Sequence, residues 1–321
     1  MFAGLALALG APDCEAGWHN REAALMGTRV RVGLHHDDAA AAEAAIDAAL
    51  AEIDRIEQLM STYIETSEIS AANRDAASGP VVVGAELFEL IRRSLEFSGL
   101  TGGAFDITYD SVGQHYDFRE RRRPDDATIE AGVELIDHRL VTLDEARRSV
   151  AFARPGVRMN LGGIAKGYAV ERAAATIAAH GIDTALVSAG GDTRLLGTRL
   201  GQPWIIGIQN PRDSAEVAVR LPLTNEAVST SGDYERFFEE DGQRYHHIVS
   251  PETGRPVTGV RSATVIGPDG VSTDALSTAV FVLGPDRGLA LIDSLPDYEA
   301  VVIDDRQRLR FSGGLADPAA E

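Results

Sequence analysis

Segments with helical and strand patterns follow one another along this chain without regular alternation. Residues 28–34 alternate polar and apolar side chains as a half-buried strand does, and the alanine-rich residues 36–59 have helical spacing. Further helical patterns lie at 67–73, 84–98, 165–180, 274–283 and 286–295. Strand patterns dominate the second half and lie at 141–152 (a hairpin), 184–196, 204–209, 217–223, 245–249, 262–266 and 299–303. Because a doubly wound parallel sheet needs regular strand–helix alternation, we expect an α+β fold with mixed or antiparallel sheets flanked by helices.

The length and charge of the chain limit what it can bind. Its 321 residues suffice for one large domain or for two lobes that share a cleft, and residues 116–126, with the run RERRRPDD, are expected to form an exposed loop between two structured halves. Lys and Arg number 30 against 49 Asp and Glu, which gives a net charge of −19. That surface repels nucleic acid and argues against it as a partner. A phosphate-bearing ligand would have to be held by local donors or by a metal ion.

Cys14 is the single cysteine, which excludes an intrachain disulfide, a CxxC redox pair and a thiolate zinc site. It follows an apolar stretch at 2–10 that is too short to span a bilayer and lacks a basic segment before it. We therefore interpret residues 1–25 as an irregular N-terminus or the remnant of an export signal. Export, with membrane association through a leader or lipid anchor, stays open.

Two glycine turns are candidates for a phosphate site. In NLGGIAKGYA (160–169), a strand end runs into Gly162-Gly163 and then into a helix that carries Lys166. Glycine lets backbone approach a ligand closely, and a helix N-terminus presents unpaired N–H groups to anions. A second turn, SAGGD (188–192), follows a strand. Each turn alone is also compatible with an ordinary tight turn.

Three other segments carry candidate chemistry. TGGAFDIT (101–108) places an aromatic ring beside an acid, which suits a flavin or adenine ring but also an ordinary core residue and helix cap. In YHHIVSPETGRP (245–256), strand alternation sends the two histidines to opposite faces, so that only one can face a cleft as a general base. In STDALST (272–278), Asp274, Ser277 and Thr278 share a helix face and suit Mg²⁺, although Ser272 or Thr273 as a plain N-cap is the alternative.

Taken together, eight segments resemble the ApbE family of FAD:protein FMN transferases in order and spacing. The resemblance covers residues 26 to about 304, which we take as one ApbE-like domain followed by a tail at 305–321. The segments are MGTRVRV (26–32), MSTYIETSEISAAN (60–73), TGGAFDIT (101–108), NLGGIAKGYAVE (160–171), VSAGGD (187–192), STSGDYERFF (229–238), YHHIVSPETGRP (245–256) and TDALSTAVFVLG (273–284).

The resemblance implies a two-lobed fold with an FAD cleft between the lobes. The implied flavin-nucleotide contacts are Met26, Tyr63, Ala104, Phe105, Asp106, Asn160 and Lys166, with His247 and Ile248 beside them. Mg²⁺ would be held by the Gly163 carbonyl, Asp274 and Thr278, with Ser277 where some relatives carry an acidic ligand. Asn160 likewise stands where many relatives have Asp, so the number of metal ions stays open.

The resemblance also implies a reaction. An acceptor Thr or Ser hydroxyl attacks the FMN phosphorus of FAD, Mg²⁺ on the diphosphate draws charge from the scissile bond, and AMP leaves. We expect His247 to receive the hydroxyl proton. The expected partner is an acceptor flavoprotein on the periplasmic side of the cell envelope. Two alternatives stay open, an FAD-binding protein without transferase activity and an Mg-dependent FAD pyrophosphatase.

Overall fold

The computed structural model describes residues 17–315, and its centre is an eight-stranded sheet in which each neighbouring pair is antiparallel. This confirms the predicted α+β fold. The strands, in spatial order, are β1 (Trp18–Leu25), β2 (Thr28–His35), β6 (Ala185–Ala189), β7 (Asp192–Leu196), β10 (Ala227–Gly232), β13 (Val260–Gly267), β14 (Glu299–Asp304) and β15 (Leu309–Phe311).

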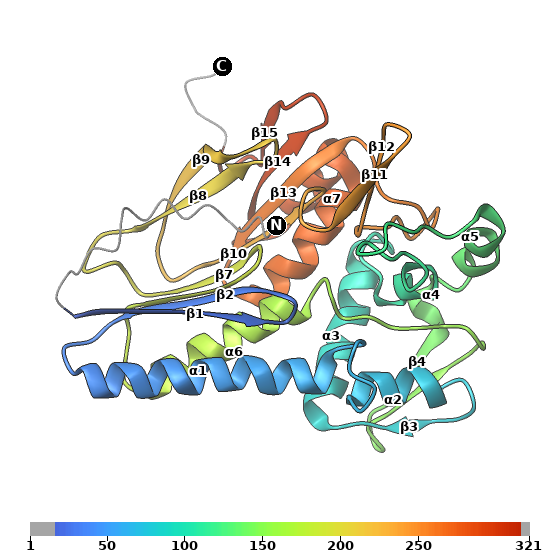
Figure 1. Ribbon diagram of the computed structural model, residues 1–321, viewed down its shortest axis with the longest axis horizontal. Coiled ribbons are helices and arrows are strands. Elements are labelled where there is room, and N and C mark those ends of the chain that lie inside the picture. Colours follow the sequence, from blue (N-terminus) through green and yellow to red (C-terminus); the bar gives the residue numbers. More distant parts are fainter. Residues whose placement is uncertain (1–16, 316–321) are drawn as a thin grey trace.

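Three helices cover one face of this sheet, namely α1 (Ala39–Met60), α6 (Ala165–Ala179) and α7 (Gly270–Asp293). Figure 1 shows α1 and α6 running along that face. Ile46, Ile53 and Ile56 of α1 are fully buried at helical spacing, and each such side chain contributes about 1.5–3 kcal/mol by leaving water. Asp38 begins α1 as its N-cap, since its carboxylate accepts from Ala40 N and Ala41 N.

A hairpin covers the opposite face of the sheet. It consists of β8 (Trp204–Asn210) and β9 (Asp213–Leu223), and Figure 1 shows it on the side away from α1. Trp204, Ile206 and Ile208 are buried in one cluster with Leu186 and Val228 of the sheet. Alternation along β6 therefore serves both faces, because Leu186 points toward this hairpin while Ala185 and Val187 belong to the core beneath the helices.

The remaining elements gather at one end of the sheet, on the right of Figure 1. Their bounds are α2 (Glu68–Asp75), β3 (Val81–Val82), α3 (Ala85–Leu100), η1 (Ile107–Tyr109), α4 (Asp110–Gly113), α5 (Asp126–Val133), η2 (His138–Leu140), β4 (Val141–Asp144) and β5 (Ser149–Phe152). Strands β3, β5 and β4 form a small sheet, and β11 (Phe237–Glu240) pairs with β12 (Gln243–His246). The predicted division into two lobes stays a prediction.

The structure differs from the sequence-based assignment in several places. Residues 18–25 form β1, although we interpreted them as irregular, because β2 supplies an antiparallel partner along their whole length. The strand predicted at 245–249 ends at His246, so that His247 lies just beyond it. Helix α7 joins the two predicted helices across a kink at Gly284 and Pro285. Its N-cap is Asp269, which accepts from Ser272 N, and not Ser272 or Thr273.

The chain termini and the most apolar helix bear on the expectations about export and membrane association. Cys14 and the other residues up to 16 of the segment interpreted as an irregular N-terminus or export-signal remnant lie outside the described range, as do residues 316–321 of the predicted tail at 305–321. Helix α7 is long and apolar enough by composition to cross a membrane, but half of its apolar window is buried and it packs against β10 and β13. In this fold it is therefore a core helix.

Candidate active site

The site is built where helices α6 and α7 cross with their backbones in contact. A Cβ atom on Gly167 would lie 2.0 Å from the Gly270 carbonyl oxygen, so only glycine permits this crossing. Ile164 precedes α6 without a side-chain cap, and Asp274 of α7 takes that role by accepting from Gly167 N at 2.9 Å. The positive end of the α6 dipole favours this carboxylate.

Lys166 connects the two glycine turns. Its Nζ lies 2.7 Å from Asp192 Oδ2 and 3.8 Å from Asp274 Oδ1, and both carboxylates are almost fully buried. Asp192 follows the Gly190-Gly191 turn, so the second turn reaches the first through this ion pair. Burial lowers the pKa of Lys166, but attraction to Asp192 and Asp274 outweighs it, so that this pKa is raised.

The cluster holds more negative than positive charge. Asp192 and Asp274 face a single ammonium group, and burial, followed by repulsion from Asp192, raises the pKa of Asp274. A bound cation beside Asp274 would offset this excess. The chemistry of the cluster therefore fits a divalent metal ion.

Oxygen donors surround Asp274 on α7. Thr278 Oγ1 lies 3.2 Å from Ser231 Oγ, and a Cβ on Gly163 would lie 3.1 Å from the same Thr278 oxygen. Three of the predicted metal-binding residues, Gly163, Asp274 and Thr278, thus converge. The Ser277 hydroxyl donates to the Asp274 carbonyl at 2.9 Å and lies 2.9 Å from Ser231 Oγ, so it is already engaged.

Within residues 17–315, no group of three or more His, Cys, Asp or Glu side chains is arranged to hold a metal ion. A cation here would have one carboxylate, with hydroxyl, backbone carbonyl, water and substrate phosphate oxygens completing its shell. Mg²⁺ binds in this way, since it keeps several waters and shares phosphates with its substrate.

The predicted flavin contacts Ala104, Phe105 and Asp106 lie in a buried turn after α3. The Phe105 ring packs edge-on against Phe97, and its edge lies 3.3 Å from where a Cβ on Gly163 would be. Both carboxylate oxygens of Asp106 accept hydrogen bonds. Oδ1 accepts from Thr108 N and from Thr108 Oγ1, and Oδ2 accepts from His138 N. Asp106 thus holds the turn in place, as the alternative of a cap residue predicted.

Asn160 contacts the glycine turn directly, whereas Tyr63 is distinguished by its exposure and Met26 by its backbone. Asn160 Oδ1 accepts from Gly162 N at 2.9 Å, and its Nδ2 donates to Asp110 Oδ1 at 3.2 Å. Tyr63 is 84% exposed, which leaves its ring free to stack on a ligand. Met26 has a positive φ of 53° and donates its N–H to Glu57, which fixes the β1–β2 turn.

The two neighbouring histidines have different surroundings, and the prediction that they face opposite ways stays a prediction. His246 Nε2 bonds to the Val257 carbonyl and the ring packs on Phe281. His247 donates its backbone N–H to the Arg236 carbonyl, and its buried Nδ1 has no hydrogen-bond partner in the part of the chain that the structure describes. Burial first, and then Arg236, lower the pKa of His247 to about 3, so its imidazole is neutral at pH 7 and a weak base in the unliganded site. The negative charge of a bound diphosphate nearby would raise this pKa toward the range of a general base. Ile248 is buried in the core with Val280 and Phe281.

Sequence reasoning did not assign a role to Asp192, Ser231, Glu235 or Arg236. Burial raises the pKa of Glu235 to about 7, and the charges of Lys166, Asp192 and Arg236 act on it. Among the described residues, the Arg236 guanidinium has no carboxylate within ion-pair distance, and its charge acts on Lys166 and His247. These four residues lie in the VSAGGD and STSGDYERFF segments, which is the sequence signal that could have indicated them. The two segments come together because β7 pairs with β10, and this pairing cannot be read from either segment alone.

The chain is similar to a known protein family and to several named relatives. The ApbE family model matches residues 26–302. A Treponema pallidum protein named FAD:protein FMN transferase is 33% identical over 93% of this chain and 88% of its own length. One from Klebsiella pneumoniae with the same name is 32% identical over 92% of this chain and 94% of its own.

Two solved structures resemble the fold closely. The ApbE protein from Thermotoga maritima has a TM-score of 0.86 and 33% identity, covering 92% of this chain and 97% of that one. The flavin transferase ApbE from Vibrio cholerae has a TM-score of 0.79 and 29% identity with the same coverage. From the extent of the family match and of these similarities, the chain belongs to the ApbE family.

Proposed function

We propose that this chain transfers the FMN half of FAD onto a Thr or Ser hydroxyl of an acceptor flavoprotein, with Mg²⁺ and with release of AMP. The observation that carries the proposal is the meeting of Asp274, Thr278 and Gly163 beside Lys166 at the N-terminus of α6. Family membership and the names of the relatives support the transferase reaction. Mg²⁺ and the type of acceptor hydroxyl belong to the proposal.

The metal would be held by the Asp274 carboxylate, the Thr278 hydroxyl and the Gly163 carbonyl. When bound, Mg²⁺ supplies positive charge that stabilises the diphosphate oxygens as the scissile bond breaks. Gly162 and Gly163 let a phosphate approach the backbone. Among the first N–H groups of α6, Ala165 N donates to the Leu161 carbonyl and Gly167 N to Asp274, so the helix favours the phosphate through its dipole. Lys166, held by Asp192, adds a fixed cation there.

His247 would accept the proton of the attacking hydroxyl. In this step a bond forms between the acceptor oxygen and the FMN phosphorus, the bond from that phosphorus to the AMP oxygen breaks, and the proton passes to the imidazole. The lowered pKa of His247 keeps the ring neutral before the reaction. Arg236, whose carbonyl holds the His247 backbone, fixes where the ring lies.

The test is mass spectrometry of a candidate respiratory flavoprotein subunit after co-expression with this chain. The proposal expects an added FMN mass on a Thr or Ser, with AMP formed in equal amount when the purified proteins react with FAD and Mg²⁺. AMP and free FMN without a modified acceptor would instead indicate the pyrophosphatase. FAD binding without AMP would indicate a flavin-binding protein. A location on the periplasmic side of the envelope is part of the same proposal.

A further inference from the structure

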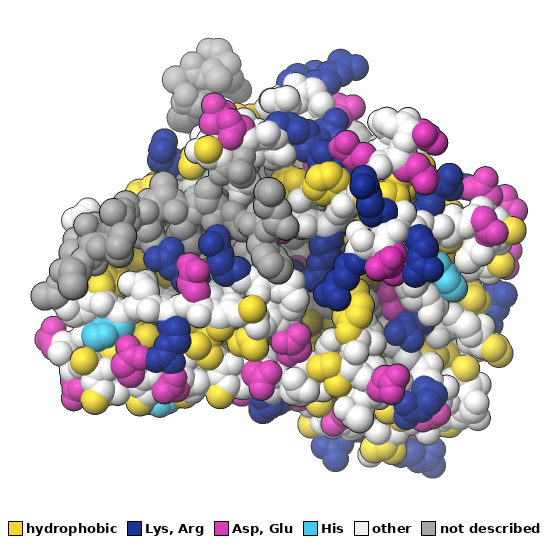
Figure 2. All heavy atoms as spheres, viewed as in Figure 1, with side chains coloured by type: hydrophobic (Ala, Val, Ile, Leu, Met, Phe, Trp, Pro, Cys, Tyr) yellow, Lys and Arg dark blue, Asp and Glu magenta, His cyan; other side chains and the backbone are white. Residues whose placement is uncertain are grey.

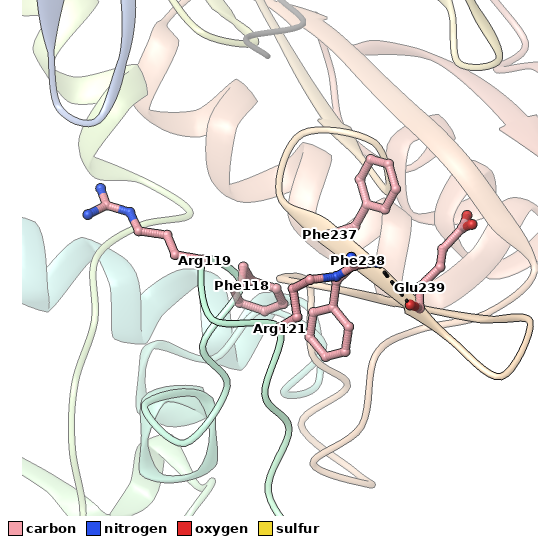
Figure 3. Close-up of a pocket in the computed structure, with 6 residues that line it drawn as sticks. All are labelled: Phe118, Arg119, Arg121, Phe237, Phe238 and Glu239. Atoms are coloured by element: carbon pink, nitrogen blue, oxygen red, sulfur yellow. Dashed lines mark hydrogen bonds between the residues drawn. The ribbon is translucent and has the colours of Figure 1, made fainter.

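A groove beside the site is formed by the arginine-rich loop before α5 and strand β11. Its lining residues are Phe118, Arg119, Arg121, Phe237, Phe238 and Glu239, and its volume is about 330 Å³. Figure 3 shows Arg119 extending away from the aromatic rings while Arg121 lies against Phe238. From its charge, this segment was predicted only to form an exposed loop.

A row of aromatic rings fixes the two walls against each other. Phe118 lies 6.2 Å from Phe238 between ring centroids, and Phe238 stacks on Tyr245 at 5.2 Å. On the other side Phe118 stacks on Tyr116, whose hydroxyl donates to the Gly254 carbonyl. The loop is therefore held in place by packing. Phe237 remains 39% exposed, which leaves an apolar surface at the groove.

Two arginines that line the groove lack an ion-pair partner among the described residues, and Glu239, which also lines it, pairs with Arg244. Arg122 pairs with Asp117 and Arg123 with Glu240, but Arg119 and Arg121 have no carboxylate partner within residues 17–315. Arg121 donates only to the Glu239 carbonyl, at 3.3 Å. Both side chains are exposed, and Figure 2 shows Lys and Arg side chains gathered on the face that carries β11 and this loop. In a chain of net charge −19, two unpaired guanidinium groups beside exposed Phe are unusual.

The groove lies next to the segment that carries the proposed general base. Phe237 follows Arg236, whose carbonyl accepts the His247 N–H, and Phe237 pairs with His246 across the β11–β12 hairpin. A polypeptide lying in the groove would therefore reach His247 within a few residues. Arginine and aromatic side chains are also the types enriched in protein interfaces.

Resting on the proposed transferase function, we propose that this groove docks the acceptor flavoprotein through an acidic segment with an apolar side chain next to the modified hydroxyl. The carboxylates of that segment pair with Arg119 and Arg121, and its apolar side chain packs on Phe237. The groove thus selects the acceptor, whereas the α6–α7 cluster binds the nucleotide.

The experiment uses two fluorescein-labelled peptides with a central Thr and one Phe, one flanked by Asp and Glu and the other by Lys. Fluorescence anisotropy with the full chain should give about tenfold tighter binding of the acidic peptide, because both the pairing and the repulsion act through exposed charges. The Arg119→Glu/Arg121→Glu variant should lose about tenfold in affinity for the acidic peptide. Higher salt should weaken its binding to the wild type.

The matched control is Arg147→Glu/Arg154→Glu, which makes the same charge change at exposed arginines outside the groove. A milder variant, Arg119→Gln/Arg121→Gln, with circular dichroism of each protein, separates loss of docking from loss of fold. Equal binding of the two peptides, or equal loss in the control, would overturn the docking proposal. AMP release from FAD and Mg²⁺ is measured in the same samples after an acceptor flavoprotein has been added. Its absence in the wild type would count against the transferase, while anisotropy would still report on the groove.

Discussion

Replacing Gly167 with Ala tests whether the α6–α7 crossing sets the metal site. The added Cβ would lie 2.0 Å from the Gly270 carbonyl oxygen and 2.6 Å from Asp274 Cβ, against an ordinary contact of at least 3.4 Å. The two helices would have to separate by about 1.4 Å at this point. Ala in place of Gly favours a helix by about 1 kcal/mol, whereas overpacking against backbone costs about 1–3 kcal/mol or more. We therefore expect net destabilisation.

The same displacement should weaken metal binding. It would separate Asp274 from Gly167 N, a 2.9 Å hydrogen bond, and move this carboxylate relative to Gly163. Because Mg²⁺ demands near-ideal geometry, the Mg²⁺ concentration at half-maximal AMP release should rise about tenfold. The assays are urea unfolding and AMP release from FAD in the presence of an acceptor flavoprotein, titrated with Mg²⁺.

The control is Gly99→Ala, at a glycine of α3 where an added Cβ meets nothing within 4 Å. It should keep or raise stability by about 1 kcal/mol through helix propensity alone and leave the Mg²⁺ midpoint unchanged. If Gly167→Ala matched this control in both stability and Mg²⁺ midpoint, the close crossing would not be what places Asp274.

Three further predictions concern the site residues. Asp274→Asn should raise the Mg²⁺ midpoint of AMP release at least about tenfold, because it removes the carboxylate ligand, and an unchanged midpoint would contradict that role. The same variant should have a higher melting temperature without metal at pH 8, because burial raises the pKa of Asp274 and disfavours its charged form. His247→Gln should slow transfer by about 10²–10⁴-fold while FAD affinity, measured by flavin fluorescence, stays nearly constant, and unaltered transfer would exclude it as the base. Since the folded pKa of His247 is about 3, below its unfolded value, the unfolded state binds the proton first as pH falls. Stability should therefore be lost between about pH 6.5 and 3, by at most about 2 kcal/mol at pH 5, and urea unfolding of His247→Gln should lack this part.

The elements that sequence patterns predicted are those whose local signal agrees with their packing. The helical spacing of Ile46, Ile53 and Ile56 predicted α1, and the same residues are its buried face. The absence of regular alternation predicted an α+β fold with mixed or antiparallel sheets, and the central sheet is antiparallel throughout. By contrast, β1 has a weak pattern of its own and depends on its pairing with β2, so its signal is tertiary.

The segments of the site could be predicted from the sequence, but the contacts between them could not, because these contacts join elements that are far apart along the chain. The glycine turn with Lys166 was visible as a motif, but its partner Asp192 lies on another strand and its partner Asp274 on another helix. The contact of Asp106 with Thr108 is local, but nothing local indicates that Asp106 Oδ2 is engaged by His138 N. The roles of Met26, Tyr63 and Ile248 toward a flavin stay predictions, since they depend on a ligand.

The most direct test of the central claim is a crystal structure of this chain with FAD and Mg²⁺. We predict a cation contacted by the Asp274 carboxylate, the Thr278 hydroxyl and the Gly163 carbonyl, with the FAD diphosphate at the N-terminus of α6 beside Lys166. A diphosphate bound elsewhere, or a cation that makes no contact with Asp274, would contradict the account.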